Sequence, residues 1–123
     1  MGAVPETGLG HLRVTLTETA YIGPGRADLL EGIAQTGSIS AAGKRMGMSY
    51  KRAWSLVQAL NDGFGAPLVE ASRGGAAQGG ANLTGLGREV LARYRAMQDK
   101  TAQAIAEDVA ALRVRIADIS GKK

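Results

Sequence analysis

Apolar and polar residues follow two different periods in the first third of the chain. Over residues 11–18 they alternate strictly, which predicts a half-buried strand. Its apolar side consists of Leu12, Val14 and Leu16. From residue 26 to 35 the apolar positions recur every three or four residues, which predicts an amphipathic helix. Its expected inward residues are Leu29, Leu30, Ile33 and Ala34, and Gly37 is expected to end it in the left-handed conformation.

Two shorter helical patterns follow on either side of Gly47. Ser38 is the predicted N-cap of a helix that reaches about Met46, and Ser49 is the predicted N-cap of a helix that reaches about Asn61. The residues expected to face inward from the second of these helices are Ala53, Trp54, Val57 and Leu60. Two short helices joined by a glycine turn predict a helix-turn-helix.

The last half of the chain changes pattern twice. Residues 67–72 and 81–84 are strand candidates on either side of the glycine-rich stretch 73–80, so they predict a β-hairpin that would form a wing. A helix is then expected from Thr84 or Gly85 to about Ile119, with apolar residues near every third or fourth position. At ~1.5 Å per residue it would extend roughly 50 Å, so a second copy of the chain is its expected partner.

These elements predict a mostly α protein with a small β wing (α+β). The expected architecture is a winged helix-turn-helix with an N-terminal strand and a long C-terminal dimerisation helix. The predicted organisation is a flexible tail over 1–10, a DNA-binding domain over 11–85, a dimerisation helix over 86–119 and a flexible tail over 120–123.

The charges of the two short helices are all positive. Between Glu31 and Asp62 there is no Asp or Glu, and the only charged residues are Lys44, Arg45, Lys51 and Arg52. Basic side chains neutralise phosphates and release condensed counterions, which supplies most sequence-independent affinity for DNA. A compact, purely basic helical pair therefore favours double-stranded DNA as a partner. This clustering is stronger evidence than the modest net charge of +4.

The composition argues against several other kinds of protein. There are no cysteines, which excludes disulfides and thiolate metal sites and suits a cytoplasmic location. The single histidine, His11, has no carboxylate at a useful spacing, so neither a metal site, a cofactor nor an enzymatic activity is expected. No apolar run is long enough for a bilayer, and the N-terminus lacks the features of a signal peptide.

Several short motifs resemble the winged helix-turn-helix of LysR-type regulators, and in particular the N-terminal domain of ModE-type molybdate-responsive regulators. The resemblance covers about Leu12 to Ala104. The motifs that carry it are Gly-Ser-Ile-Ser-Ala-Ala at 37–42, Ser49-Tyr50-Lys51 with Ala53-Trp54, Leu60, Pro67-Leu68-Val69, the glycine-rich stretch, and Leu83-Thr84-Gly85-Leu86-Gly87.

The resemblance implies a homodimeric transcriptional regulator linked to molybdenum metabolism. The helix that begins at Ser49 would enter a major groove of a palindromic operator, the wing would touch the adjacent backbone, and the long helices would pair. ModE-type regulators also carry a C-terminal region that binds molybdate. The sequence ends at Lys123 without residues for such a region, so we expect a stand-alone DNA-binding member without direct molybdate sensing.

Two groups of candidate site residues follow. The predicted DNA contacts are Ser38, Ser40, Ser49, Tyr50, Lys51, Arg52, Ser55 and Arg73. The predicted dimer contacts are Leu12, Val90, Tyr94, Met97, Ile105 and Leu112. Lys51 or Arg52 could bond either a guanine or a phosphate, and the sequence leaves both roles open. Trp54 is expected in the core rather than stacked on a base.

Two other classes of function remain open at this point. A winged helix can serve as a protein-interaction module that no longer reads DNA, with the long helix recruiting a different partner. A small-molecule sensor, with a molybdate site at a dimer interface, is the third hypothesis.

Overall fold

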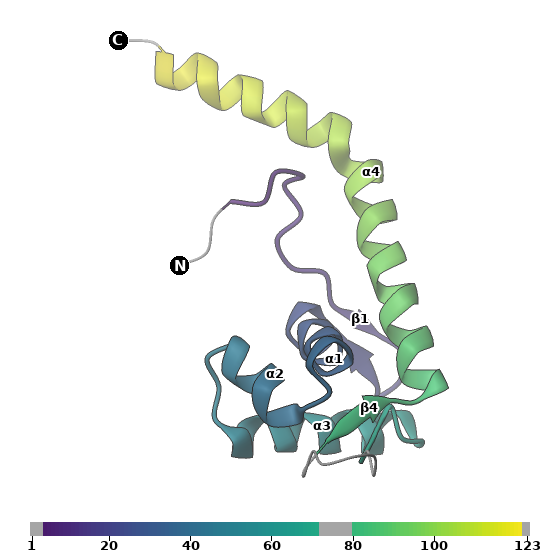
Figure 1. Ribbon diagram of the computed structural model, residues 1–123. Helices are drawn as coiled ribbons and strands as arrows, with labels where there is room; N and C mark the ends of the chain where they lie inside the picture. Colours follow the sequence, from purple (N-terminus) through teal and green to yellow (C-terminus); the bar gives the residue numbers. More distant parts are fainter. Residues whose placement is uncertain (1–3, 72–79, 122–123) are drawn as a thin grey trace. The chain divides into compact units, whose positions relative to one another are not determined.

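A computed structural model describes residues 4–71 and 80–121 of the chain (Figure 1). The elements are β1 (Val14–Thr15), β2 (Tyr21–Ile22), α1 (Pro24–Thr36), α2 (Ile39–Arg45), α3 (Tyr50–Phe64), β3 (Val69–Ala71), β4 (Ala81–Leu83) and α4 (Gly85–Gly121). By their internal contacts, residues 13–94 form one unit, and the segment up to Leu12 forms another with the residues from Arg95 onward. The predicted class, mostly α with a small β wing, is confirmed.

Helix α1 supplies the largest share of the core of the 13–94 unit. It begins with Pro24 at its first position, where the missing N–H has no helical partner to lose. It ends at Gly37, whose φ of 71° confirms the predicted left-handed cap. The prediction that Ala34 faces inward was wrong. Ala34 is exposed, and Gly32 instead lies on the buried side of the helix. It packs closely against α2, because a Cβ at Gly32 would lie 2.9 Å from the Cβ of Ala42.

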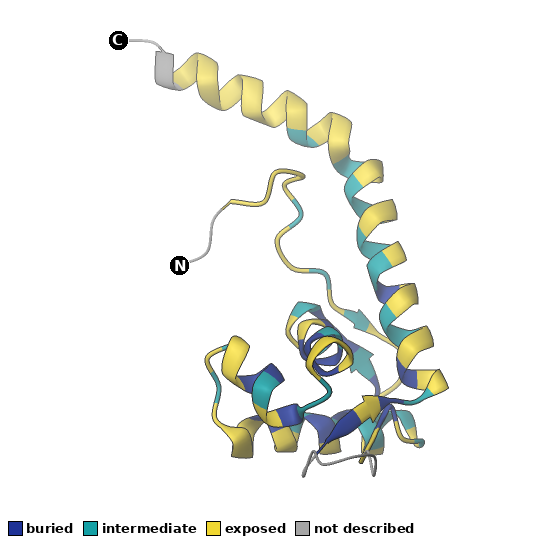
Figure 2. Cartoon of the chain, in the orientation of Figure 1, coloured by how far each residue is buried: buried dark blue, intermediate teal, exposed yellow. Residues whose placement is uncertain are grey.

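The buried residues of this unit come from every helix and from both strands of the second hairpin (Figure 2). Strands β3 and β4 pair antiparallel, with Val69 opposite Leu83 and Ala71 opposite Ala81. This pairing confirms the predicted hairpin on either side of the glycine-rich stretch. Aliphatic residues fill the interior: Ile22, Leu29, Leu30, Ile33, Val57, Leu60 and Leu68 are nearly inaccessible to solvent.

The strand predicted over residues 11–18 is much shorter in the structure. Only Val14–Thr15 pairs, antiparallel to β2, which the sequence pattern did not reveal. Leu16 was expected to be half-buried but is 54% exposed. The chain turns immediately after it, because the Thr17 hydroxyl accepts hydrogen bonds from the N–H groups of Thr19 and Ala20.

The other unit consists of the N-terminal segment and the C-terminal part of α4. Residues 4–10 form neither helix nor strand, but Arg113 on α4 donates hydrogen bonds to the carbonyl oxygens of Glu6 and Pro5 at 2.9 and 3.1 Å. The same part of α4 has four large aliphatic residues that are largely exposed, namely Leu112, Val114, Ile116 and Ile119. Across the described ranges, none of the helices combines the length and apolar character needed to cross a bilayer.

Candidate nucleic-acid interface

The helix-turn-helix formed by α2 and α3 is built by two serine caps and a tight turn. The Ser38 hydroxyl accepts a hydrogen bond from the N–H of Ala41 at 3.0 Å, and the Ser49 hydroxyl accepts one from the N–H of Arg52 at 3.1 Å. Between the helices, Gly47 adopts a φ of 73°. A side chain there would be strained in this left-handed conformation. The sequence therefore predicted both caps and the turn correctly.

Close packing between α2 and α3 holds the two helices in a fixed relation. A Cβ added to Gly43 would lie 2.8 Å from the Cβ of Ala53, so the helices meet at a position where only glycine fits. Ala53 is fully buried at this crossing. The outer face of α3 is thus presented on a rigid support.

We expect Ser49→Ala to lower the free energy of unfolding by about 1 kcal/mol, because one N–H at the start of α3 loses its partner. Thermal or urea unfolding followed by circular dichroism measures this. Ser55→Ala, an exposed serine in the same helix, is the matched control and should change stability little. Equal stability of the two variants would contradict the capping role.

The first turns of α3 place the main predicted contact residues on the surface. Tyr50 is 53% exposed, and Lys51 and Arg52 are also exposed. Ser55 lies about one turn further along and is exposed as well. Ala53, Val57 and Leu60 form the buried face of the same helix. The outward face therefore has two cations, a phenol and a hydroxyl within about two turns.

Trp54 was predicted in the core, and this prediction was wrong. It is 38% exposed, because a helix that buries Ala53, Val57 and Leu60 turns the position after Ala53 away from the core's centre. With Tyr50 it lines a groove of about 160 Å³ between α3 and the β3–β4 hairpin. Two aromatic side chains therefore lie at the edge of the outward face.

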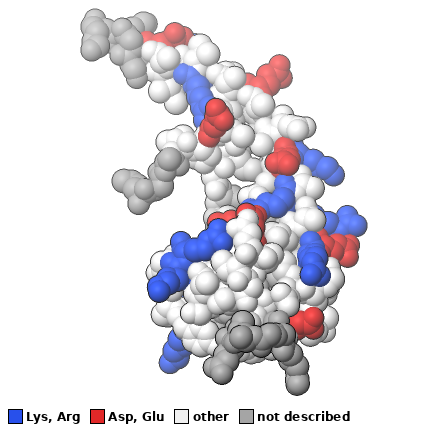
Figure 3. Space-filling view, viewed as in Figure 1, with Lys and Arg blue, Asp and Glu red and all other residues white. Residues whose placement is uncertain are grey.

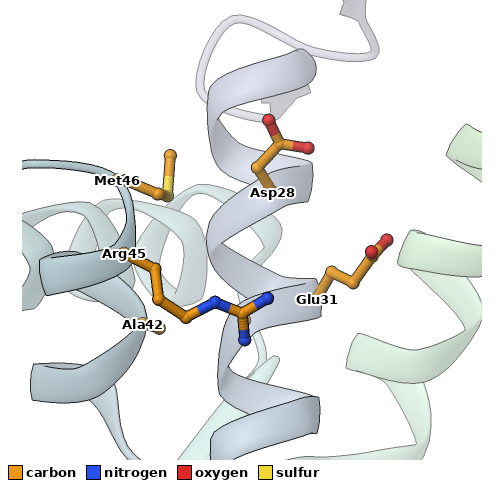
Figure 4. A pocket seen from close by; sticks show the side chains of 6 residues that line it. Asp28, Glu31, Ala42, Arg45 and Met46 are labelled. Atoms are coloured by element: carbon orange, nitrogen blue, oxygen red, sulfur yellow. The ribbon is translucent and has the colours of Figure 1, made fainter.

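The remaining basic residues of the helix-turn-helix lie on α2. Arg45 donates a hydrogen bond to the Gln35 side chain at 2.8 Å and lines a cavity of about 180 Å³ with Asp28 and Glu31. Figure 4 shows the Arg45 side chain extending from α2 across α1. Lys44, on the same helix, is exposed. Along α4, acidic and basic side chains both lie on the surface (Figure 3).

The hairpin is attached directly to the start of α2. The N–H of Ala81 donates to the carbonyl oxygen of Gly37 at 2.9 Å, and Ser38 pairs with Gly80 in an isolated bridge. Ser38 is half-buried at this junction, whereas Ser40 is exposed. Arg73, the contact predicted in the wing, lies outside the described residues. The hairpin and the helix-turn-helix thus form one continuous surface within the 13–94 unit.

The predicted dimer contacts fall into different environments. Leu112 is 64% exposed, and four others are half-buried, namely Leu12, Val90, Met97 and Ile105. Tyr94 must be corrected, because it is fully buried within the single chain and is not on a surface open to a second copy. It is a core residue of α4. The seam pattern alone did not distinguish burial in the chain from burial in a dimer.

No cluster suited to a metal ion, with three or more His, Cys, Asp or Glu side chains, occurs in the part of the chain that the structure describes. The surface defined by α2, the turn, α3 and the hairpin instead has the architecture of a winged helix-turn-helix.

Comparison with known families agrees with this architecture. The model of the bacterial regulatory helix-turn-helix proteins of the lysR family matches residues 26–88. The chain therefore belongs to this family, which consists of regulators and not of enzymes. The predicted resemblance to LysR-type regulators is confirmed.

Individual relatives are consistent with the ModE-type resemblance. The chain is 49% identical over 79 residues to the molybdenum-pterin-binding protein MopB of Rhodobacter capsulatus, covering 64% of this chain and 29% of that protein. It is 39% identical over 83 residues to the DNA-binding transcriptional dual regulator ModE of Escherichia coli K12, covering 68% of this chain and 32% of that protein. The chain thus spans about a third of the length of these relatives.

A solved structure supports the fold. The CbnR DNA-binding domain in complex with DNA superposes with a TM-score of 0.57 at 25% sequence identity, covering 71% of this chain and 94% of that chain.

Proposed function

We propose that this protein is a transcriptional regulator that reads double-stranded DNA with the outward face of α3. The observation that carries the proposal is the exposure of Tyr50, Lys51 and Arg52 on the capped first turns of that helix. Two relationships support it: the similar Escherichia coli protein is named a DNA-binding transcriptional regulator, and the similar CbnR domain was solved with DNA. A regulator of a bacterial chromosome works in the cytoplasm, which is the proposed location.

The proposed contacts divide into groove and backbone contacts. In a helix-turn-helix the start of the second helix faces base edges in the major groove, so Lys51 and Arg52 lie where they can bond guanine acceptors or phosphates. The Ser49 hydroxyl uses an oxygen lone pair for its cap, which leaves its O–H free to donate to a phosphate. Ser38, Ser40, Ser55 and the hairpin complete the proposed contact set with backbone or base contacts.

We propose that α4 pairs with α4 of a second copy. Leu112, Ile116 and Ile119 recur at helical spacing and are all more than 60% exposed, which is unusual for a stripe of large aliphatic residues. A two-fold dimer would read a palindromic operator, with half-sites separated by one or more helical turns of ~34 Å.

Leu112→Glu is expected to convert the dimer into a monomer at micromolar concentration, because it places a charge in the apolar seam. Sedimentation velocity measures the mass in solution. Val114→Glu is the matched control, since Val114 is 59% exposed but lies on a different side of α4. Equal dissociation by both variants, or by neither, would contradict the seam.

We propose a link to molybdenum metabolism through the genes that are regulated. The support is the naming of the relatives: MopA and MopB are molybdenum-pterin-binding proteins, and the Azotobacter vinelandii relative is the molybdenum transport protein ModE. The proposed link lies in the promoters that the protein binds, and not in direct molybdate sensing.

Selection of bound sequences from random duplex DNA, repeated at 50 and 200 mM salt and with and without molybdate, tests the proposed function. We expect a palindromic consensus, affinity that falls steeply with salt, and no effect of molybdate. Enrichment of no sequence, with no binding even at low salt, would contradict DNA reading and favour a protein-interaction module. Enrichment only with molybdate would favour a sensor.

A further inference from the structure

Asn61, in the last turn of α3, connects the proposed recognition helix to the hairpin. Its side chain is half-buried and makes three hydrogen bonds to the backbone at the start of β3. The Oδ1 oxygen accepts from the N–H of Leu68 at 2.8 Å and from the N–H of Val69 at 3.3 Å. The Nδ2 group donates to the carbonyl oxygen of Val69 at 3.2 Å. The amide thus meets both backbone groups of Val69, as a neighbouring strand would.

The same short segment is held from its other side by the residue that precedes α4. The N–H of Thr84 donates to the carbonyl oxygen of Leu68 at 2.9 Å, and the Thr84 hydroxyl donates to the carbonyl oxygen of Pro67 at 2.8 Å. Residues 67–69 are therefore clamped between α3 and the start of α4. Because β3 continues from these residues, their placement sets the orientation of the hairpin.

The covalent link between α3 and β3 does not itself provide this control. Gly65 ends α3 with a φ of 71°, and glycine allows a wide range of backbone conformations. Pro67 restricts its own φ and that side of the link, but the freedom at Gly65 leaves the direction of β3 open. The bonds from Asn61 supply a specific geometry for this segment. Because buried N–H groups without partners are costly, the segment has one favoured placement on Asn61.

We propose that Asn61 is a positioning residue that sets the orientation of the β3–β4 hairpin relative to α3. It thereby allows α3 to occupy a groove while the hairpin meets the flanking DNA backbone. The second part of this inference rests on the proposed function. The first part concerns the geometry of the 13–94 unit alone.

The orientation is tested without DNA by residual dipolar couplings of backbone amides in β3, β4 and α3. Asn61→Ala removes all three bonds. Asn61→Asp keeps the shape and the two accepted bonds, but it replaces the donor to Val69 by a carboxylate oxygen that faces the Val69 carbonyl oxygen. We expect the hairpin amides of Asn61→Ala to depart from the orientation found in the wild type, and those of Asn61→Asp to depart less. Asn82→Ala, an exposed asparagine on β4 itself, is the matched control and should match the wild type.

DNA binding provides the second readout. For Asn61→Ala we expect an affinity loss of about tenfold and a fall of about 1 in the slope of log affinity against log salt, because a backbone contact by the hairpin is lost. Base preference within each half-site should remain that of the wild type, because α3 is unchanged. If Asn61→Ala only destabilised the fold, it would lower the folded fraction, and the slope of log affinity against log salt would stay that of the wild type.

Wild-type couplings and an unchanged salt slope in both folded Asn61 variants would overturn the inference. If Asn61→Ala fails to fold, Asn61→Asp decides by the same two measurements. If the wild type shows no salt-dependent DNA binding, the proposed function fails separately, and the dipolar couplings alone decide whether Asn61 orients the hairpin.

Discussion

Replacing Lys51 and Arg52 together with alanine is expected to lower operator affinity by about 100-fold without changing the melting temperature. Both side chains are exposed on the first turns of α3, so their removal leaves the core of the helix intact. A good bidentate contact to a base is worth ~1–3 kcal/mol, and each 1.4 kcal/mol changes a dissociation constant tenfold. Fluorescence anisotropy with a labelled operator measures the loss.

The matched control removes the same charge from α4. Lys100→Ala with Arg115→Ala also lowers the net charge by two, and both side chains are exposed. We expect a small affinity change for this control. The single variants separate the two roles that the sequence left open. Loss of a base contact relaxes specificity at one position, whereas loss of a phosphate contact weakens all sequences and reduces the salt slope by ~0.9. Equal losses in test and control would contradict a specific contact surface.

Gly87→Ala is expected to cost about 3 kcal/mol of unfolding free energy and to lower the melting temperature by roughly 10–20 °C. Gly87 lies in the first turn of α4, and a Cβ there would lie 2.1 Å from the carbonyl oxygen of Leu68. That carbonyl is fixed by its hydrogen bond from Thr84, so the clash cannot be relieved by a side-chain rotation. Either α4 or the start of β3 must move.

Gly85→Ala is the control, two residues earlier in the same helix. A Cβ at Gly85 would meet nothing within 4 Å, so alanine fits there without displacing a neighbour. We expect this variant to be as stable as the wild type or more stable. Differential scanning calorimetry of the two variants compares them directly. A Gly87→Ala protein as stable as the Gly85→Ala protein would show that α4 does not pack as described.

Signals confined to a few neighbouring residues were sufficient to predict much of the fold. Ser38 and Ser49 cap their helices, and Gly37 takes the left-handed conformation, because each role depends on local backbone geometry. The strand predicted over 11–18 failed beyond Thr15 because the Thr17 turn competes with it. The alternation of apolar and polar residues does not show at which residue the pairing with a neighbouring strand ends.

Features that depend on distant residues were missed. Asn61 was predicted only as the end of a helix, because its partners lie at Leu68 and Val69 across a chain reversal. Trp54 was predicted in the core but is 38% exposed, and Tyr94 was predicted at a dimer interface but is buried within the chain. Helical spacing gives the angle of a side chain around the helix axis but not what covers each side. For the proposed interface, the sequence was sufficient to predict the basic turn of α3 but not its aromatic edge.

The outward face of α3 is the central claim, and a tethered cleavage reagent tests it most directly. The chain has no cysteine, so Gln58→Cys, exposed on α3, provides a single attachment point for a DNA-cleaving iron chelate. We expect cuts inside the selected operator, at two positions related by its symmetry, and none from the matched Gln103→Cys protein on α4. Bound operator that is cut no more from position 58 than from position 103 would contradict the account.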